Sequence, residues 1–347
     1  MSGIKKDILT VSDRFILSRF SGIRKVLSTS AHNGGIRTGL QAVFNYDGKQ
    51  GGGEEIQLIG GTYESHMRCI SEILLGIPAH LSTGMMTAAD MKNAAFREYD
   101  YDGLNVRAIV TAGIDHNAGR AGDPAIWQEH EGIWKPAPPL GTVNIIVLIG
   151  AALTDGAMAR ALITCTEAKT AAIQELSLPS LFSDGLATGS GTDGCILVAD
   201  MESSIHLTEA GKHCKLGELT GRAVKEAVRE ALFRQSGACA KRQANVFRRL
   251  SRFGITRELL WQTALNMNLP FLKKQIFLDQ ASVWASLPHS AAWAALQAHL
   301  MDEYHWGMMT SAIFTIAENA LWNGFFKTEK GAVLAESIVS EILKSFA

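Results

Sequence analysis

The pattern of hydrophobic and polar positions divides the chain into two parts. In about the first two thirds, short runs rich in β-branched residues and bounded by turn residues predict strands. Longer stretches with apolar residues at helical spacing lie between them and predict helices. The predicted strands span 14–20, 23–30, 55–61, 106–114, 142–150 and 194–201, and the predicted helices span 62–76, 152–176 and 218–233.

The order of these elements indicates the fold class. Paired strands come early and strand-helix alternation comes later, so we expect an α+β (or α/β) fold in which helices cover a mixed β-sheet. No convincing strand follows residue 233, and five of the seven tryptophans lie beyond it. We therefore expect a first domain over 1–233 and an all-helical appendage over 237–347, whose tryptophans form its own core or a subunit contact.

Composition narrows the class of protein. With 47% hydrophobic and 19% charged residues the chain is globular, and a net charge of -1 provides no overall field to attract nucleic acid or an anionic membrane. Its five cysteines are widely spaced without a C-x-x-C pair, which favours reduced thiols over disulfides or zinc. The N-terminus lacks a secretion signal and no apolar run is long enough to span a bilayer, so we expect a cytoplasmic protein without membrane insertion. Homo-oligomer formation stays open.

One stretch of the appendage is strongly basic. Residues 241–257 contain six lysines and arginines and no acid, and their apolar residues lie at helical spacing. This favours a solvated basic face, with a phosphate-bearing ligand or partner as the alternative. The stretch lacks a recognised nucleic-acid motif, so no nucleic-acid partner is expected.

Four glycine-bearing polar loops are candidates for a shared site, at 30–35, 111–123, 187–194 and 210–218. Glycines let backbone N–H groups converge on an anion, although tight turns use the same residues without a ligand. In the third loop, the side chain of Asp193 either caps a turn or orients a histidine, and the hydroxyls of Ser190 and Thr192 either satisfy local backbone or meet a substrate.

A predicted helix carries Glu167 and Lys169. Because the two residues are two positions apart, they point to different sides and do not form an ion pair on one helix face. Both suit an exposed polar face; alternatively Glu167 is a general base in a cleft and Lys169 binds a carboxylate or amide oxygen.

The fourth loop places His213 beside Cys214 and ahead of Glu218. Histidine titrates near neutrality and suits proton transfer, whereas a glutamate in the first turn of a helix is also stabilised by the helix dipole. No second Cys/His pair accompanies Cys214, so neither a metal site nor a nucleophilic thiol is expected.

Several segments in order, GTVNIIVLI, AMARALITCTEAKTAAIQEL, SGTDGCILVA and GKHCKLGELTGRAVKEAVREAL, resemble the adenosylcobinamide amidohydrolase family. LSTSAHNGG, GMMTAA and VTAGIDHNAGRAGD are similar to its N-terminal half, so the resemblance covers about residues 12–233. One departure concerns Lys212 and Cys214, where the family pattern G-T-H-T-K has hydroxyl residues, and we expect no catalytic role for these two.

The resemblance implies a corrinoid salvage hydrolase that cuts the amide between aminopropanol and a propionate of the corrin ring, converting adenosylcobinamide to adenosylcobyric acid. Some relatives also act on complete cobamides. No cofactor is expected, because cobalt enters only as part of the corrinoid substrate. The alternatives are an amidase or acyltransferase for another substrate, and a corrinoid-binding protein without catalysis.

Amide hydrolysis needs a nucleophile, an oxyanion stabiliser and an acid for the leaving amine. We expect attack by water, with His213 or Glu167 as base and the 189–193 loop around the oxyanion; a covalent route through Ser190 or Thr192 is the alternative. The expected catalytic residues are His213, Glu167, Asp193, Glu218, Thr192 and Lys169, and the expected substrate-binding residues are Asn33, Gly34, Asn117, Asn144, Gly189, Ser190, Gly191 and Lys215.

Overall fold

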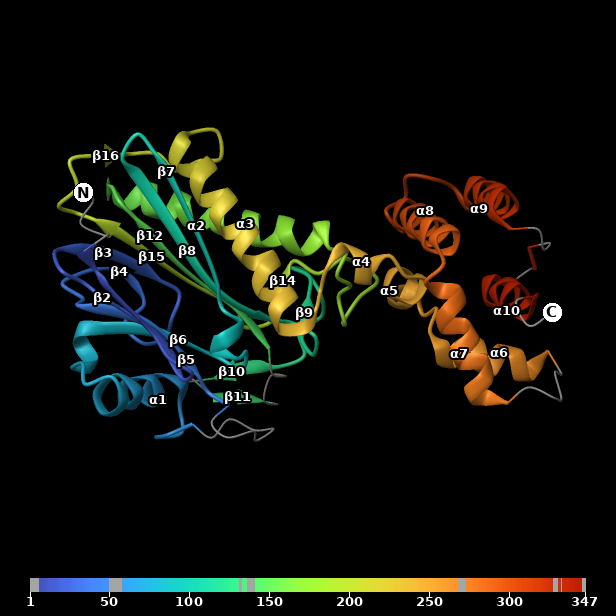
Figure 1. The fold of residues 1–347 in the computed structure, drawn as a ribbon, viewed down its shortest axis with the longest axis horizontal. Helices are drawn as coiled ribbons and strands as arrows, with labels where there is room; N and C mark the ends of the chain where they lie inside the picture. The colour runs from blue at the N-terminus through green and yellow to red at the C-terminus, as the bar shows by residue number, and fades with distance from the viewer. Residues whose placement is uncertain are drawn as a thin grey trace. The chain divides into compact units, whose positions relative to one another are not determined.

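The computed structural model describes residues 6–49, 58–130, 133–135, 141–267, 273–326, 330–331 and 333–344. The chain forms two compact units, coloured along the sequence in Figure 1. The sheet unit comprises Met1–Leu176 and Ala187–Cys239, and the helical unit comprises Ser177–Leu186 and Ala240–Ala347. A ten-residue segment that interrupts the sheet unit in sequence therefore belongs to the helical unit.

The larger sheet of the sheet unit has six strands: β3 (Arg24–Ser28), β4 (Gly35–Thr38), β7 (Ala95–Tyr101), β8 (Leu104–Gly113), β12 (Thr142–Ile149) and β15 (Gly194–Asp200). Their order is β4-β3-β15-β12-β8-β7. β12 and β15 run parallel, whereas all other neighbours in this sheet are antiparallel. β12 is buried along its whole length, in keeping with its uninterrupted apolar sequence. The sheet is mixed, as predicted.

A smaller sheet contains β1 (Ile8–Val11), β2 (Phe15–Arg19), β5 (Ala42–Asp47) and β6 (Ser82–Thr87), in that order. Side chains alternate between its two faces, as they must along a strand. Ile16 and Val43 pack into a core shared with the larger sheet, whereas Leu17 and Phe44 pack into a second core on the opposite face. The two sheets therefore stack face to face.

Helices cover both outer faces of this stack. α2 (Asp155–Glu175) and α3 (Lys215–Ser236) pack on each other and on the larger sheet, as Figure 1 shows. α1 (Tyr63–Cys69) continues as a π-helical turn, Ile70–Leu74, and contributes Met67 and Ile70 to the second core. All three predicted helices are confirmed.

Short elements complete the sheet unit. β9 (Ala118–Gly119) pairs with β14 (Gly189–Ser190), β10 (Gln128–His130) with β11 (Ile133–Lys135), and β13 (Ala152–Leu153) with β16 (His206–Leu207). Two 3₁₀ turns span Ala79–Leu81 and Met91–Asn93.

The helical unit contains no strand among its described residues and confirms the predicted all-helical region. Its helices are α4 (Ala240–Gln243), α5 (Val246–Leu250), α6 (Arg257–Asn266), α7 (Lys274–Ala285), α8 (Pro288–His305), α9 (Ser311–Phe325) and α10 (Leu334–Lys344), with a 3₁₀ turn at Ser251–Phe253. Trp261, Trp284, Trp293 and Trp322 are buried in its core. Trp306 is 53% exposed. The four buried tryptophans form the core of their own unit, as expected, whereas Trp306 does not.

The basic stretch is partly used inside the helical unit. Arg252 forms a two-pronged ion pair with Asp302, at 2.5 and 2.6 Å, and donates to the backbone carbonyl of Asp184. Arg249 donates to the hydroxyl of Ser177. The expectation of a solvated basic face is therefore wrong at these two arginines, because they bind the segment Ser177–Leu186.

One expected strand is not found. Residues 58–61 of the predicted strand 55–61 form a turn, and the rest of that strand lies outside the described residues. Strands β5 and β6 were not expected, because buried polar residues such as Asn45 and Thr83 interrupt their apolar pattern. Across the described ranges, no helix combines the length and apolar character needed to cross a bilayer.

Candidate functional site

Helix α2 presents Glu167 and Lys169 to different neighbours, as their spacing predicts. The Glu167 carboxylate pairs with the ammonium of Lys212 at 2.6 Å, and Lys169 pairs with Asp193. Each pair lines a different cavity. The structure therefore separates the candidate residues into two groups around one helix.

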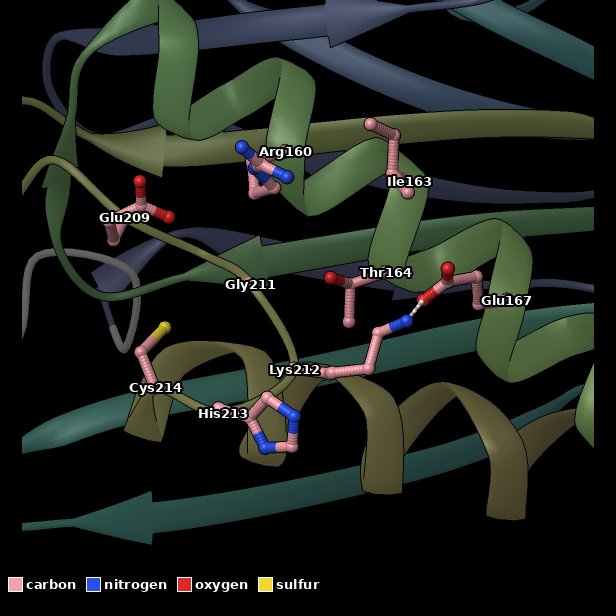
Figure 2. A pocket seen from close by; sticks show the side chains of 9 residues that line it. All are labelled: Arg160, Ile163, Thr164, Glu167, Glu209, Gly211, Lys212, His213 and Cys214. Carbon is pink, nitrogen blue, oxygen red and sulfur yellow. Dashed lines mark ion pairs between the residues drawn. The ribbon is translucent and has the colours of Figure 1, made fainter.

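The larger cavity has a volume of about 440 Å³ and is open to solvent. It lies between α2 and the loop 208–214, and Figure 2 shows the Lys212–Glu167 ion pair at one side of it. Its lining residues are Arg160, Ile163, Thr164, Glu167, Glu209, Gly211, Lys212, His213 and Cys214. Two residues that we expected to be catalytic, Glu167 and His213, thus meet at one cavity.

Two contacts hold the loop that carries His213 against α2 and α3. The hydroxyl of Thr164 donates to the carbonyl of Ala210 at 2.9 Å. A Cβ atom at position 217 would lie 2.0 Å from the carbonyl oxygen of Gly211, so only glycine at position 217 allows this approach. Helix α3 then begins at Lys215, and its N-cap residue Cys214 makes no side-chain cap hydrogen bond.

His213 is exposed, and its imidazole makes no hydrogen bond or ion pair with any residue that the structure describes. Both ring nitrogens therefore remain accessible to a ligand or water in the cavity. The Lys212–Glu167 pair lies in the same lining and is itself about half exposed. This arrangement places a group that can accept a proton beside a fixed positive charge.

Glu218 and Lys215 form a separate pair on the first turn of α3. The Lys215 ammonium lies 2.6 Å from the Glu218 carboxylate, and this hydrogen bond lowers the pKa of Glu218. Lys215 also lies 4.4 Å from the ring centre of Tyr101. Neither residue lines the His213 cavity, and a lowered pKa makes Glu218 a weaker proton acceptor.

The smaller cavity has a volume of about 230 Å³ and lies at the other side of α2. Its polar lining includes the largely buried ion pair between Lys169 and Asp193. The Asp193 carboxylate also accepts from the backbone N–H of Val143 at 3.0 Å and from the hydroxyl of Ser190 at 2.6 Å. Lys169 and Asp193 thus hold the loop before β15 against α2.

The glycine-rich loop 189–193 satisfies its own polar groups. The N–H of Ser190 donates to Asp193, and the N–H of Thr192 donates to the Ser190 hydroxyl at 3.3 Å. The hydroxyl of Thr192 donates to the carbonyl of Gly141 at 2.8 Å. Gly189 makes room for the ion pair, because a Cβ there would lie 2.0 Å from Asp193 Oδ2, whereas Gly191 is open. In this conformation the N–H groups of Ser190 and Thr192 stabilise the loop rather than face an oxyanion.

The three asparagines expected to bind amides have partners within the protein. Asn33 donates to the carbonyls of Ala79 and Ser82, Asn117 to that of Gly141, and Asn144 to that of Met86 and to the side chain of Asn45. Asn117 and Asn144 are each only 2% exposed. Gly34 is needed for packing, since a Cβ there would lie 2.1 Å from the Ser30 carbonyl oxygen.

The two groups stand on different sides of α2 and line different cavities. Glu167 and Lys169 are two residues apart on this helix; Glu167 holds Lys212 at the His213 cavity, whereas Lys169 holds Asp193 at the smaller one. His213 and Asp193 of the 189–193 loop therefore face different cavities in this structure, and their joint action on one amide stays a prediction.

Three further charged residues of the His213 cavity, Arg160, Glu209 and Lys212, were not among the expected site residues. Arg160 and Glu209 stand at exposed positions of a helix and a loop, where nothing in a single sequence distinguishes them from solvated surface charges. Lys212 departs from the family pattern and is not an expected catalytic residue, yet it lines the cavity and pairs with Glu167. Across the described ranges, no cluster of three or more His, Cys, Asp or Glu residues could hold a metal ion.

Comparison with known proteins identifies the family to which the chain is similar. The model of the adenosylcobinamide amidohydrolase family (CbiZ) matches residues 3–240, close to the span of the resemblance. An uncharacterized protein, MJ1613, from Methanocaldococcus jannaschii is 44% identical over 161 residues; the match covers 44% of this chain and 62% of that protein. The crystal structure of the PH0078 protein from Pyrococcus horikoshii OT3 matches with a TM-score of 0.32 and 12% identity, over 64% of this chain and 78% of that one.

Proposed function

Because this chain belongs to the adenosylcobinamide amidohydrolase family, we propose that it hydrolyses the amide between aminopropanol and a propionate side chain of the corrin ring. The products are adenosylcobyric acid and aminopropanol. The family match over residues 3–240 carries this proposal, and it includes every residue of the His213 cavity. Cobalt is part of the substrate in this reaction.

The His213 cavity suits one arm of such a substrate. The cavity has a volume of about 440 Å³ and is open to solvent, so the ring can stay outside while the arm that carries the amide enters. The cavity offers both a free imidazole and a fixed ion pair. In the smaller cavity, the Asp193 carboxylate is already bound by Lys169, Ser190 and the backbone N–H of Val143, whereas the His213 imidazole has no such partner among the described residues.

In the proposed reaction the His213 imidazole accepts a proton from water as the water oxygen attacks the amide carbon. The carbonyl oxygen becomes a tetrahedral oxyanion, which the Lys212 ammonium and the positive end of helix α3 stabilise. The imidazolium then donates its proton to the departing nitrogen as the C–N bond breaks. The products are a carboxylic acid, which ionises, and aminopropanol. Glu167 is a positioning residue, because its carboxylate holds the Lys212 ammonium.

The test is incubation of the purified chain with adenosylcobinamide and detection of adenosylcobyric acid and aminopropanol by mass spectrometry. His213→Ala is expected to lower kcat/KM at least about a hundredfold, the usual contribution of a general base. His206→Ala is the matched control, because His206 is also exposed but lies outside the cavity lining. Absence of product at high enzyme concentration would overturn the proposed function, and full activity of His213→Ala would overturn the mechanism.

A further inference from the structure

Two opposite charges stand at the end of the His213 cavity away from the Lys212–Glu167 pair. Arg160 is on α2 and Glu209 is on the loop 208–214, as Figure 2 shows. A Cβ added at Gly211 would lie 3.7 Å from Glu209 Oε2 and 4.0 Å from Arg160 Cδ, so both side chains flank the same glycine. Glycine at position 211 leaves the space between them open.

These two side chains do not neutralise each other. No ion pair of 4.0 Å or less joins them, and neither makes a side-chain hydrogen bond with a residue in the described parts of the chain. Other charges in the same lining do pair, since Lys212 reaches Glu167 at 2.6 Å. The guanidinium of Arg160 thus keeps its N–H donors available, and the carboxylate of Glu209 keeps its acceptors available.

The chemistry of this pair selects a type of ligand. An anion in the space would face the Glu209 carboxylate, and a cation would face the Arg160 guanidinium. A neutral primary carboxamide fits both, because its carbonyl oxygen accepts from Arg160 while its NH₂ group donates to Glu209. Hydrogen bonds to charged groups are stronger than those between neutral groups, so two such bonds give a specific contact.

We propose that Arg160 and Glu209 form a specificity site that binds a peripheral primary carboxamide of the corrinoid while a neighbouring arm enters the cavity. This inference rests on the proposed function, since the corrin ring carries such amides along its rim beside the arm that is cut. Arg160 and Glu209 bind the substrate at a distance from the reacting amide. They select an intact amide over a carboxylate at the contacted position.

The test compares adenosylcobinamide with its singly hydrolysed analogues, in each of which one peripheral carboxamide has become a carboxylate. For at least one separated isomer, the wild-type protein should show kcat/KM at least about tenfold below that for adenosylcobinamide. Glu209→Gln should reduce that discrimination at least about fivefold, because an amide side chain can donate to the carboxylate instead of repelling it. Arg160→Gln should lower kcat/KM for adenosylcobinamide, mainly through KM.

Asp13→Asn is the control, because it removes an exposed carboxylate outside the cavity and should leave the discrimination unchanged. If wild-type protein hydrolyses adenosylcobinamide but Glu209→Gln discriminates as wild type does for every isomer, the specificity site is overturned and the proposed function stands. If wild-type protein does not hydrolyse adenosylcobinamide, the proposed function fails and this inference fails with it.

Discussion

Lys169 and Asp193 form an ion pair that ties helix α2 to the glycine-rich loop preceding strand β15. Their side chains are only 11% and 15% exposed, and Asp193 accepts further hydrogen bonds from Ser190 and Val143. Removing one partner of a largely buried pair leaves the other charge uncompensated in a poorly solvated place. The pair therefore contributes to the stability of the sheet unit whatever part it has in catalysis.

Lys169→Met is expected to lower the free energy of unfolding by about 3 kcal/mol, because it leaves the Asp193 carboxylate without its cation. Urea denaturation followed by far-UV circular dichroism measures this change. Lys225→Met is the matched control, since Lys225 joins α3 to Glu175 of α2 through a pair that is about 40% exposed, and it should cost less than about 1 kcal/mol. Equal losses in the two variants would contradict the role assigned to burial.

Gly189→Ala is expected to destabilise the protein by about 2 kcal/mol, because the new methyl group would lie where Asp193 Oδ2 and Lys169 Nζ now meet. Gly191→Ala, two residues later in the same loop, is the control. Its Cβ would have the Trp127 Nε1 atom as its nearest neighbour, at 3.8 Å, which is an ordinary contact. Thermal unfolding of both variants checks the difference, and a wild-type melting temperature for Gly189→Ala would show that the loop does not hold this pair tightly.

The sequence predicts those helices and strands whose buried positions are occupied by apolar side chains. β12 and β15 have long apolar runs, and α2 and α3 have clear helical spacing, so all four are identifiable. Strand β5 is different, because Asn45 lies within it and is buried by donating to Thr111 from the neighbouring sheet. Such a hydrogen bond satisfies a polar group in the core but leaves no periodic signal in the sequence.

The candidate site is predictable only in part for a related reason. Helix geometry predicts that the side chains of Glu167 and Lys169 point to different sides of α2, and the structure shows them pairing with different partners. The neighbours of His213 depend on the path of the loop 208–214, which is set by a contact 46 residues apart, between Thr164 and Ala210. Arg160 lines the same cavity from helix α2, and no local pattern in the sequence indicates that it does so.

His66 should make the protein less stable in mild acid. It is 3% exposed, and burial lowers the pKa of its imidazole below the usual 6.5. Its Nδ1 accepts from the backbone N–H of Ile59 at 3.1 Å, so the folded state requires the neutral ring. Below about pH 6.5 the unfolded chain therefore binds more protons than the folded one. The free energy of unfolding is highest above that pH and decreases as the pH falls below it.

Free energies of unfolding at pH 7.5 and 5.5 measure this effect. His66→Asn keeps a side-chain acceptor near the Ile59 N–H and removes the titrating ring, so its loss of stability between the two pH values should be smaller than that of wild type. His206→Asn changes an exposed histidine and should retain the wild-type difference. The same loss in His66→Asn and wild type would remove His66 as the cause.

Arg252, together with Arg249, should hold the segment Ser177–Leu186 within the helical unit. Its side chain is 4% exposed, and it binds both the carboxylate of Asp302 and the backbone carbonyl of Asp184. Arg252→Met leaves the Asp302 carboxylate without its cation, so we expect the helical unit to lose about 3 kcal/mol of stability. Arg252→Lys should recover only part, because one ammonium cannot reproduce the two parallel bonds.

Tryptophan fluorescence during urea denaturation reports mainly on the helical unit, which contains five of the seven tryptophans. Limited proteolysis checks the second consequence, since cleavage within 177–186 should become faster in Arg252→Met. Lys274→Met is the matched control, because its pair with Glu258 in the same unit is at least half exposed and should contribute less than about 1 kcal/mol. An unchanged cleavage rate in Arg252→Met would mean that other contacts, such as that of Arg249 with Ser177, suffice to hold the segment, and it would contradict the role assigned to Arg252.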